Sequence, residues 1–179
     1  MLKNKENKKK NCLLYISYDG IFDQLGQSQI LPYLINISKE YKIHLISFEK
    51  NENLLNKNNN YIFNLLKKND FLWIKIRYSQ NSFIRLFYFF YSLIIISYLI
   101  FFKKIRLIHL RSYIAALIIW PFSKFLKLKI IFDMRGFWPE EKVDRSSWKK
   151  TDIKYKFFKK IEKYFLILNK SIVCLTNDA

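Results

Sequence analysis

CLLYISYDGIFDQLGQSQILPYL, residues 12–34, places a strand, a loop and a helix in the order typical of α/β proteins. Its apolar start, residues 12–18, predicts a buried β-strand, and the loop that follows holds Gly20 and Gly26. A helix is predicted from about Ser28, because apolar residues beyond it recur at helical spacing and a proline fits the first turn. Such a unit can bring backbone N–H groups to an anion. The glycine spacing matches neither GxGxxG nor a P-loop, so this signal alone is weak.

The same alternation of apolar strands and helices continues to the end of the chain. Further strands are predicted at residues 42–48, 71–76, 107–110, 128–132 and 171–175. Further helices are predicted at residues 54–66, with an interruption at 58–60, and at 82–104, 114–127 and 154–168. Strands that alternate with helices predict an α/β fold, a Rossmann-like parallel sheet with helices on both faces.

The length of the chain predicts a single domain. We expect residues 1–11 to be a basic, disordered tail and residues 12–179 to be the domain. The tail is not a secretory signal, because the apolar run after it is short and Asp19 ends it. The sequence stops just after a predicted strand, which suggests a domain truncated before a second half. Cys12 and Cys174 lie in apolar strands and are expected to be buried thiols in a reducing cytoplasm.

The net charge of +18 predicts an anionic partner, such as nucleic acid, anionic lipid or a phosphorylated substrate. The acidic residues are unevenly placed, and six of the fourteen lie in two predicted loops: Asp19, Asp23, Asp133, Glu140, Glu141 and Asp144. Acids gathered in this way would weaken a nucleic-acid surface, whereas they suit a carbohydrate-binding or catalytic pocket. Lysine dominates the basic residues and no Arg-rich cluster with interleaved aromatics is found, so we expect no nucleic-acid partner.

A second informative stretch is residues 130–144, IIFDMRGFWPEEKVD, in which a predicted strand opens into a charged loop. Open α/β sheets bind ligands at the carboxyl ends of their strands. The stretch therefore predicts a site, although a polar loop that only caps a strand gives the same pattern. The predicted loop at residues 19–28 follows another strand, and His109, Arg111, Ser112 and Tyr113 lie at the end of a third, which favours the interpretation as a site.

Residues 86–102, LFYFFYSLIIISYLIFF, form an uncharged run bracketed by Arg85 and by Lys103 and Lys104. As a helix the run would be about 25 Å long, slightly shorter than a ~30 Å hydrocarbon core. Three interpretations stay open: a buried or half-buried helix of the sheet domain, a helix in a membrane interface, and a membrane span. A span would place the two halves of the βα alternation on opposite sides of a membrane. The positive charge of the chain favours contact with anionic lipid.

Five stretches in order resemble the N-terminal half of family 4 glycosyltransferases of the GT-B type. They are YISYDGIFDQLGQSQILPYL, IHLISFEK, IHLRSYIAAL, IIFDMRGFWPEEKVD and IVCLT, and the resemblance covers residues 13–176. It implies two Rossmann-like domains that face each other across a cleft. The N-terminal domain, present here, would hold the acceptor, and a C-terminal domain would hold most of the nucleotide sugar.

The resemblance also implies which residues line that cleft. Donor or acceptor binding is assigned to Gly20, Gly26, Gln27, Ser28, His109, Arg111, Ser112, Tyr113, Gly136, Phe137, Trp138, Glu140 and Glu141. Many members have a histidine where this chain has residues 133–136, DMRG, so its role cannot be transferred directly. We expect Asp133 to accept hydrogen bonds from sugar hydroxyls and Arg135 to pair with a phosphate or carboxylate, and we predict catalytic roles for both. Phe137 and Trp138 either stack on a sugar or pack in the core.

The reaction implied by the resemblance is transfer of a sugar from a nucleoside diphosphate to a glycan or lipid-linked acceptor, with retention at the anomeric carbon. No cofactor and no metal is expected, since His44 and His109 are isolated in strands. The protein would act in the cytoplasm, peripherally at the inner membrane face, and would be inactive without its donor domain. The alternative is a non-catalytic remnant or split subunit that serves as a binding module at the membrane surface.

Overall fold

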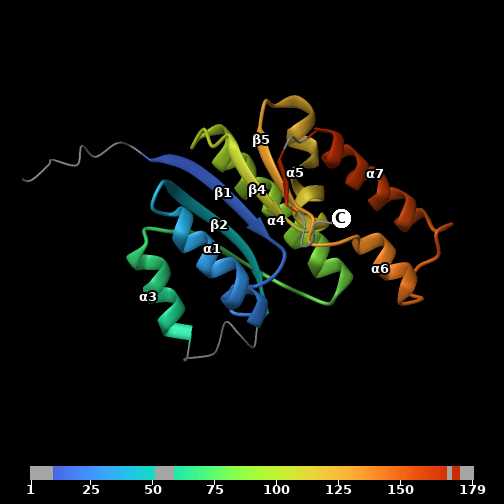
Figure 1. Cartoon of the computed structure of the whole chain (residues 1–179), viewed down its shortest axis with the longest axis horizontal. Helices are drawn as coiled ribbons and strands as arrows, with labels where there is room; N and C mark the ends of the chain where they lie inside the picture. The colour runs from blue at the N-terminus through green and yellow to red at the C-terminus, as the bar shows by residue number, and fades with distance from the viewer. Residues whose placement is uncertain (1–9, 51–58, 169–170, 174–179) are drawn as a thin grey trace, which may run out of the picture.

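The computed structural model describes residues 10–50, 59–168 and 171–173, and within them strands and helices alternate (Figure 1). The strands are β1 Asn11–Ser17, β2 Tyr41–Glu49, β3 Leu72–Arg77, β4 Leu107–Arg111, β5 Lys129–Asp133 and β6 Ser171–Val173. They form one parallel sheet in the order β3-β2-β1-β4-β5-β6. The strand order changes direction between β1 and β4, so the predicted Rossmann-like sheet is confirmed.

Helices cover both faces of the sheet. They are η1 Gly26–Ile30, a π-helical turn, then α1 Leu31–Ile37, α3 Asn60–Lys68, α4 Ser82–Phe101, α5 Tyr113–Phe125, α6 Trp138–Asp144 and α7 Ile153–Leu168. Successive side chains of a strand point to opposite faces, and β1 follows this rule. Leu14 and Ile16 pack in a hydrophobic cluster with α4, α5 and α7, whereas Leu13 and Tyr15 pack with α1 and α3. Figure 1 shows the two sets of helices on opposite sides of β1.

The charged stretch after β5 is a helix and not the loop that we predicted. Glu140 and Glu141 stand on the first turn of α6, and Pro139 occupies one of its first two positions. Proline is favoured there by its fixed φ, and acidic side chains are favoured by the partial positive charge of the helix N-terminus. Seven residues are too few to show a helical repeat, which explains the wrong prediction.

The other elements lie within a few residues of their predicted bounds. The second predicted helix is α3 where the structure describes it, and residues 51–58 lie outside the described part of the chain. The basic tail up to residue 9 and Cys174 lie outside it as well. Cys12 carries a free thiol and is half-buried rather than fully buried.

The apolar helix α4 belongs to the sheet domain, but only one side of it is covered. Ile96, Leu99 and Ile100 are buried in the hydrophobic cluster that α4 shares with α5 and α7. Within the described ranges α4 is the one helix long and apolar enough to cross a membrane, by length and composition. Its packing against the core agrees with the first interpretation, a half-buried helix of the sheet domain.

Candidate functional site

Three strand ends bring two arginines and two aspartates to the carboxyl edge of the sheet. In the strand register, Ser17 lies beside Arg111, and Arg111 lies beside Asp133. Asp19 comes shortly after β1, and Arg135 comes shortly after β5. Because the ends of neighbouring parallel strands share one edge, all four charged side chains reach the same place.

These four side chains form one ion-pair network. Arg111 Nη1 lies 2.8 Å from Asp133 Oδ2, and Arg111 Nε lies 3.7 Å from Asp19 Oδ2. Arg135 Nη1 lies 2.6 Å from the same oxygen of Asp19. Arg111 Nη2 also donates a hydrogen bond of 2.5 Å to Gln29 Oε1. Asp19 therefore holds both arginines, one buried and one half-buried.

The buried arginine of this network pairs with its buried aspartate. Arg111 and Asp133 are 6% and 5% exposed. Burial raises the pKa of Asp133, while the charge and the hydrogen bond of Arg111 oppose the rise. This geometry favours a positioning role for Asp133 over the direct contact with sugar hydroxyls that we predicted.

Two residues of this edge have a strained backbone. Ser112 has φ 88° and ψ 163°, a region that non-glycine residues almost never adopt, and Arg135 has φ 63°. Ser112 is held by a 2.9 Å hydrogen bond from its N–H to the carbonyl of Asp133. Such strain typically costs about 1–3 kcal/mol per residue and clusters at functional sites. Both residues lie at the wall of the same cavity.

A cavity of about 670 Å³ opens beside the network. The predicted site residues that line it are Ser112, Tyr113, Arg135, Gly136, Trp138 and Glu141. Asp19, which we did not single out, lines it as well. The wall includes the first turn of α5, where backbone N–H groups lack helical partners and the helix dipole is positive. With Arg135 beside it, this wall can bind an anion.

A second polar network lies between α5, α6 and α7. The hydroxyl of Tyr113 lies 2.6 Å from Glu162 Oε2 and 3.1 Å from the carbonyl oxygen of Gly136. Lys159 pairs with Glu140 at 2.7 Å and also with Glu162. Burial and the neighbouring Glu162 raise the pKa of Tyr113 well above its usual range, so this tyrosine stays protonated. The network fixes the position of Glu140 but commits it to Lys159.

The two predicted stacking residues have different surroundings. The Trp138 ring is half-buried and packs edge-to-face on Trp148 and Phe158, with centroids 5.1 and 4.8 Å apart. It also lines the cavity. Phe137 is 42% exposed and lies under the ammonium group of Lys159. Trp138 therefore combines core packing with access to the cavity, whereas Phe137 is not among the lining residues.

The glycine-bearing loop after β1 is closed by a carboxylate of the protein itself. Glu49, which is fully buried at the end of β2, accepts hydrogen bonds from the N–H groups of Ile21 at 2.7 Å and Phe22 at 3.3 Å. A Cβ on Gly20 would lie 2.5 Å from Glu49 Oε2. We predicted that a ligand could approach the backbone of this loop, but Glu49 already accepts hydrogen bonds from its amide groups.

The other residues predicted in that segment serve its internal packing. A Cβ on Gly26 would lie 2.1 Å from the carbonyl oxygen of Gly20, so η1 can approach the loop only with glycine there. Gln27 Nε2 donates to the carbonyl of Phe22, and Ser28 Oγ donates to the carbonyl of Gln24. The structure does not bring these residues to the wall of the cavity.

His109 also lies away from the cavity. Its Nδ1 is 3.1 Å from the hydroxyl of Tyr33, and its ring packs on Tyr15 at 4.7 Å. Burial, with the positive charge of Arg111, lowers the pKa of His109 to about 4, so the ring is neutral at physiological pH. Its position suits a structural role in the cluster of α1 and α3.

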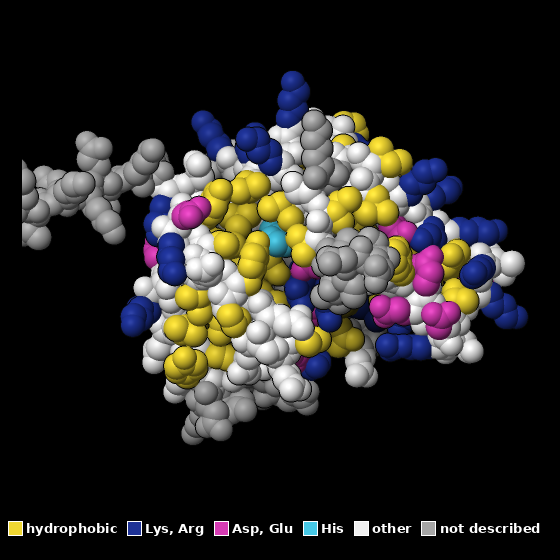
Figure 2. Space-filling view, in the orientation of Figure 1, with side chains coloured by type: hydrophobic (Ala, Val, Ile, Leu, Met, Phe, Trp, Pro, Cys, Tyr) yellow, Lys and Arg dark blue, Asp and Glu magenta, His cyan; other side chains and the backbone are white. Residues whose placement is uncertain are grey.

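Basic and acidic side chains gather in different places on the surface. Figure 2 shows Lys and Arg side chains projecting around the rim, while acidic side chains gather over the region of α6. Within the residues that the structure describes, no group of three or more His, Cys, Asp or Glu side chains is placed to hold a metal ion.

Sequence reasoning missed several residues that shape this site. Glu162 had a visible signal, because it is an acid on the apolar face of α7 between Phe158 and Phe165, and it is 4% exposed. Glu49 gave no such signal, since a charged residue at a strand end is ordinary. Asp19 was noted only as one of the clustered acids.

The fold is shared with solved structures, although the sequences are remote. No protein-family model and no curated protein matches the chain. The structure is similar to a sucrose-phosphate synthase from Thermosynechococcus elongatus, with a TM-score of 0.54 and 10% identity over 93% of this chain and 48% of that chain. A glycosyltransferase from Rickettsia africae ESF-5 gives a TM-score of 0.46 and 14% identity over 93% and 43%. The chain spans about half the length of these proteins, and the likeness to the synthase shows a shared fold.

Proposed function

We propose that the chain is the N-terminal, acceptor-side domain of a retaining glycosyltransferase of the GT-B type, family 4. Joined to a donor domain, it transfers a sugar from a nucleoside diphosphate to a glycan or lipid-linked acceptor at the cytoplasmic face of a membrane. One observation carries the proposal. Arg135 and the first turn of α5 face a cavity at the carboxyl edge of a fold that corresponds to half of a sucrose-phosphate synthase chain.

Each part of the cavity has a task in this reaction. Arg135 and the N–H groups of α5 stabilise the negative charge that grows on the diphosphate as the sugar leaves. Asp19 fixes Arg135, and Arg111 in turn fixes Asp19. Trp138 offers an aromatic surface to a sugar ring at the same wall.

The donor domain supplies the remaining contacts. Closure of two domains over the cavity excludes water and aligns the anomeric carbon with the acceptor hydroxyl. The positive net charge of the chain attracts both the anionic donor and an anionic membrane surface. No cofactor enters this proposal.

Arg135→Ala in the complete enzyme is expected to lower sugar transfer at least about tenfold, the effect of losing roughly 1.4 kcal/mol of transition-state stabilisation. The fold should stay intact, because Asp19 keeps Arg111 as a partner and the Arg135 side chain is 29% exposed. The measurement is transfer of labelled sugar from a panel of nucleoside diphosphates to membrane-extracted acceptors, with thermal unfolding followed by circular dichroism.

Arg106→Ala is the matched control, because Arg106 is an exposed arginine beside the opposite end of β4. It should turn over at the wild-type rate. Near-normal transfer by Arg135→Ala would show that the cavity is not the site.

A non-catalytic binding module at the membrane surface is the second candidate, and the exposed apolar side of α4 favours it. A module would bind anionic vesicles, yet no nucleoside diphosphate sugar would support transfer in the presence of a donor domain. An enzyme would give transfer that depends on Arg135.

A further inference from the structure

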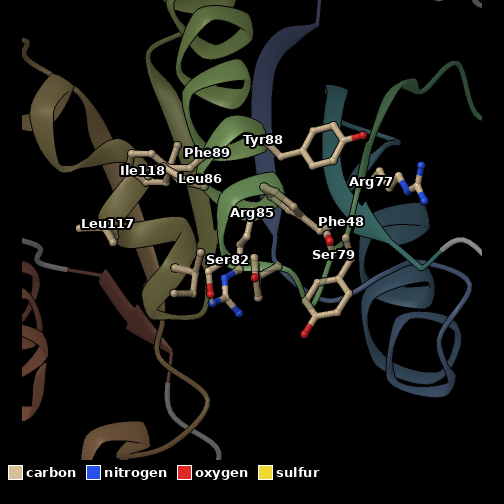
Figure 3. Close-up of a pocket in the computed structure, with 13 residues that line it drawn as sticks. Phe48, Arg77, Ser79, Ser82, Arg85, Leu86, Tyr88, Phe89, Leu117 and Ile118 are labelled. Atoms are coloured by element: carbon tan, nitrogen blue, oxygen red, sulfur yellow. Dashed lines mark hydrogen bonds between the residues drawn. The ribbon is translucent and has the colours of Figure 1, made fainter.

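A second cavity, of about 210 Å³, lies between the start of α4, the loop before it and α5. Its apolar lining comes from Phe48, Leu86, Phe89, Leu117 and Ile118. Figure 3 shows Leu86, Phe89 and Ile118 gathered at one end, with Arg85 and Ser82 at the other. Arg77 points away from this space in the same view. Arg77 and Arg85 are both among its lining residues, and of the two Arg85 also lines the larger cavity.

The apolar cavity adjoins the cavity of the candidate site. Tyr18, Tyr78, Arg85 and Ile114 line both of them. Side chains at this boundary need only move aside for a single molecule to reach both spaces, with an apolar part in the smaller cavity and a polar part beside Arg135. Arg85 stands where the two parts of such a molecule would join.

Arg85 is available to bind an anion at this junction. It is exposed, and its Nη2 donates to Ser82 Oγ at 3.1 Å. In the described part of the chain no carboxylate lies within ion-pair distance of it, whereas Arg111 has two such partners and Arg135 has one. A phosphate attached to an apolar chain would give Arg85 its counter-ion while the chain fills the cavity.

The uncovered side of α4 leads to the mouth of the apolar cavity. A stripe of apolar side chains follows helical spacing along it: Phe83, Phe87, Phe90, Ile94, Tyr98 and Phe101. Phe83 is 85% exposed and Ile94 is 68% exposed. Leu86 borders this stripe, and it lines the cavity while remaining 54% exposed. Lys103 and Lys104 follow the end of the helix. An apolar stripe with flanking lysines fits the interface of an anionic bilayer.

We propose that the smaller cavity binds the hydrocarbon chain of a lipid-linked acceptor, with Arg85 on its phosphate and the α4 stripe in the bilayer interface. This inference rests on the proposed function and narrows its acceptor to an anionic lipid. The lipid remains partly in the membrane, its chain enters beside Leu86, and its head group reaches the cavity lined by Arg135 and Trp138.

The test uses dodecyl phosphate, below its micelle concentration, as the probe in calorimetric titrations of the purified chain. Dodecyl phosphate should bind at least about tenfold more tightly than ethyl phosphate, which lacks the apolar chain. Leu117→Trp fills the cavity and should weaken binding of dodecyl phosphate at least about tenfold. Ile94→Trp makes the same change on the exposed stripe, outside the cavity, and should leave binding within about twofold of wild type.

Arg85→Gln tests the polar end of the cavity. It should weaken dodecyl phosphate about tenfold, while dodecyl maltoside, which has an uncharged head, keeps its affinity. Circular dichroism checks that each variant is folded. Ser82→Trp, on the exposed first turn of α4, blocks the same cavity if Leu117→Trp does not fold.

Equal binding by Leu117→Trp and Ile94→Trp, or equal affinity for dodecyl phosphate and ethyl phosphate, would overturn the lipid site. A chain that is a dimer in sedimentation equilibrium, and that Leu86→Lys dissociates, would overturn it too, because a second copy would then cover this side. Sugar transfer to a water-soluble glycan without lipid binding would refute this inference and leave the proposed function standing. Lipid binding without any sugar transfer would refute the proposed function and leave the lipid site standing.

Discussion

The segments that follow β1 and β5 start alike and end differently. Each follows a buried strand, each carries an aspartate at or just beyond the strand end, and each contains a glycine soon afterwards. After β1, the carboxylate of Glu49 accepts hydrogen bonds from the N–H groups of Ile21 and Phe22. After β5, Arg135 and Gly136 line an open cavity. The same sequence pattern thus gives a loop whose amide groups are hydrogen-bonded within the protein after β1, and an accessible cavity wall after β5.

The difference lies in where the compensating charge comes from. The first segment has its anion inside the fold, so it needs none from outside, and burial raises the pKa of Glu49 even against the hydrogen bonds that it accepts. In the second segment Arg135 pairs with Asp19 and still lines the open cavity. We therefore expect changes after β1 to affect stability and changes after β5 to affect ligand binding.

The largest effect is expected where one side chain joins the two segments. Arg111→Met removes the partner of Asp133 and leaves a buried carboxylate unpaired, which should lower the free energy of unfolding by about 3–5 kcal/mol. Urea denaturation followed by tryptophan fluorescence measures it. Arg106→Met, at an exposed position, should change stability by less than about 0.5 kcal/mol. A loss below about 1 kcal/mol for Arg111→Met would show that the backbone N–H and the charge of Arg135 are enough to stabilise the Asp133 carboxylate.

The two glycines offer the most direct contrast between the segments. Gly26→Ala forces a Cβ to 2.1 Å from a backbone oxygen, and such overpacking should destabilise the fold by about 3 kcal/mol. In Gly136→Ala the Cβ meets Glu141 Oε1 at 2.8 Å. Glu141 is exposed and flexible enough to move, so we expect a loss below about 1 kcal/mol. Similar losses for both variants in thermal unfolding would contradict the contrast.

A smaller effect is expected on the face of the sheet that carries α1 and α3. The pKa of His109 is lowered to about 4 in the folded protein, against 6.5 for an exposed histidine. As the pH falls below 6.5, His109 is protonated in the unfolded chain but stays neutral in the folded chain. The free energy of unfolding therefore decreases between pH 6.5 and 4. At pH 5 the loss should be about 2 kcal/mol.

His109→Gln keeps a polar partner for Tyr33 and removes this titration. The measurement is the free energy of unfolding of wild type and variant at pH 7 and pH 5. The variant should lose about 2 kcal/mol less than wild type over that interval. Equal pH dependence of the two proteins would mean that the buried ring accepts a proton without unfolding.

The sequence predicted the sheet because its strands are apolar runs at regular intervals, and periodicity depends only on neighbours along the chain. It predicted the edge where Arg111, Asp133 and Arg135 meet for the same reason. It did not predict that Glu49 closes the loop after β1, because that contact joins the end of β2 to loop residues 28 and 27 positions earlier in the chain. It also missed α6, which is too short to show a repeat. The hydrogen-bond partner of each polar group depends on side-chain directions, and a linear sequence pattern does not contain them.

The strand register has a consequence for how the chain is made. Leu13 of β1 pairs with Leu107 of β4, so this central pairing waits until β4 has been synthesised, on the order of 5–20 s later. The helix α4 precedes β4 and α5 in the chain, and helices form within about a microsecond. From the end of α4 at Phe101 to the end of α5 at Phe125 is roughly 1–5 s of synthesis, and in that time Ile96 and Leu99 lack the cover of β4 and α5 while the stripe on the opposite side of α4 is also exposed. The nascent chain therefore exposes its most apolar helix to a membrane or a chaperone before the cluster that α4 shares with α5 and α7 is complete.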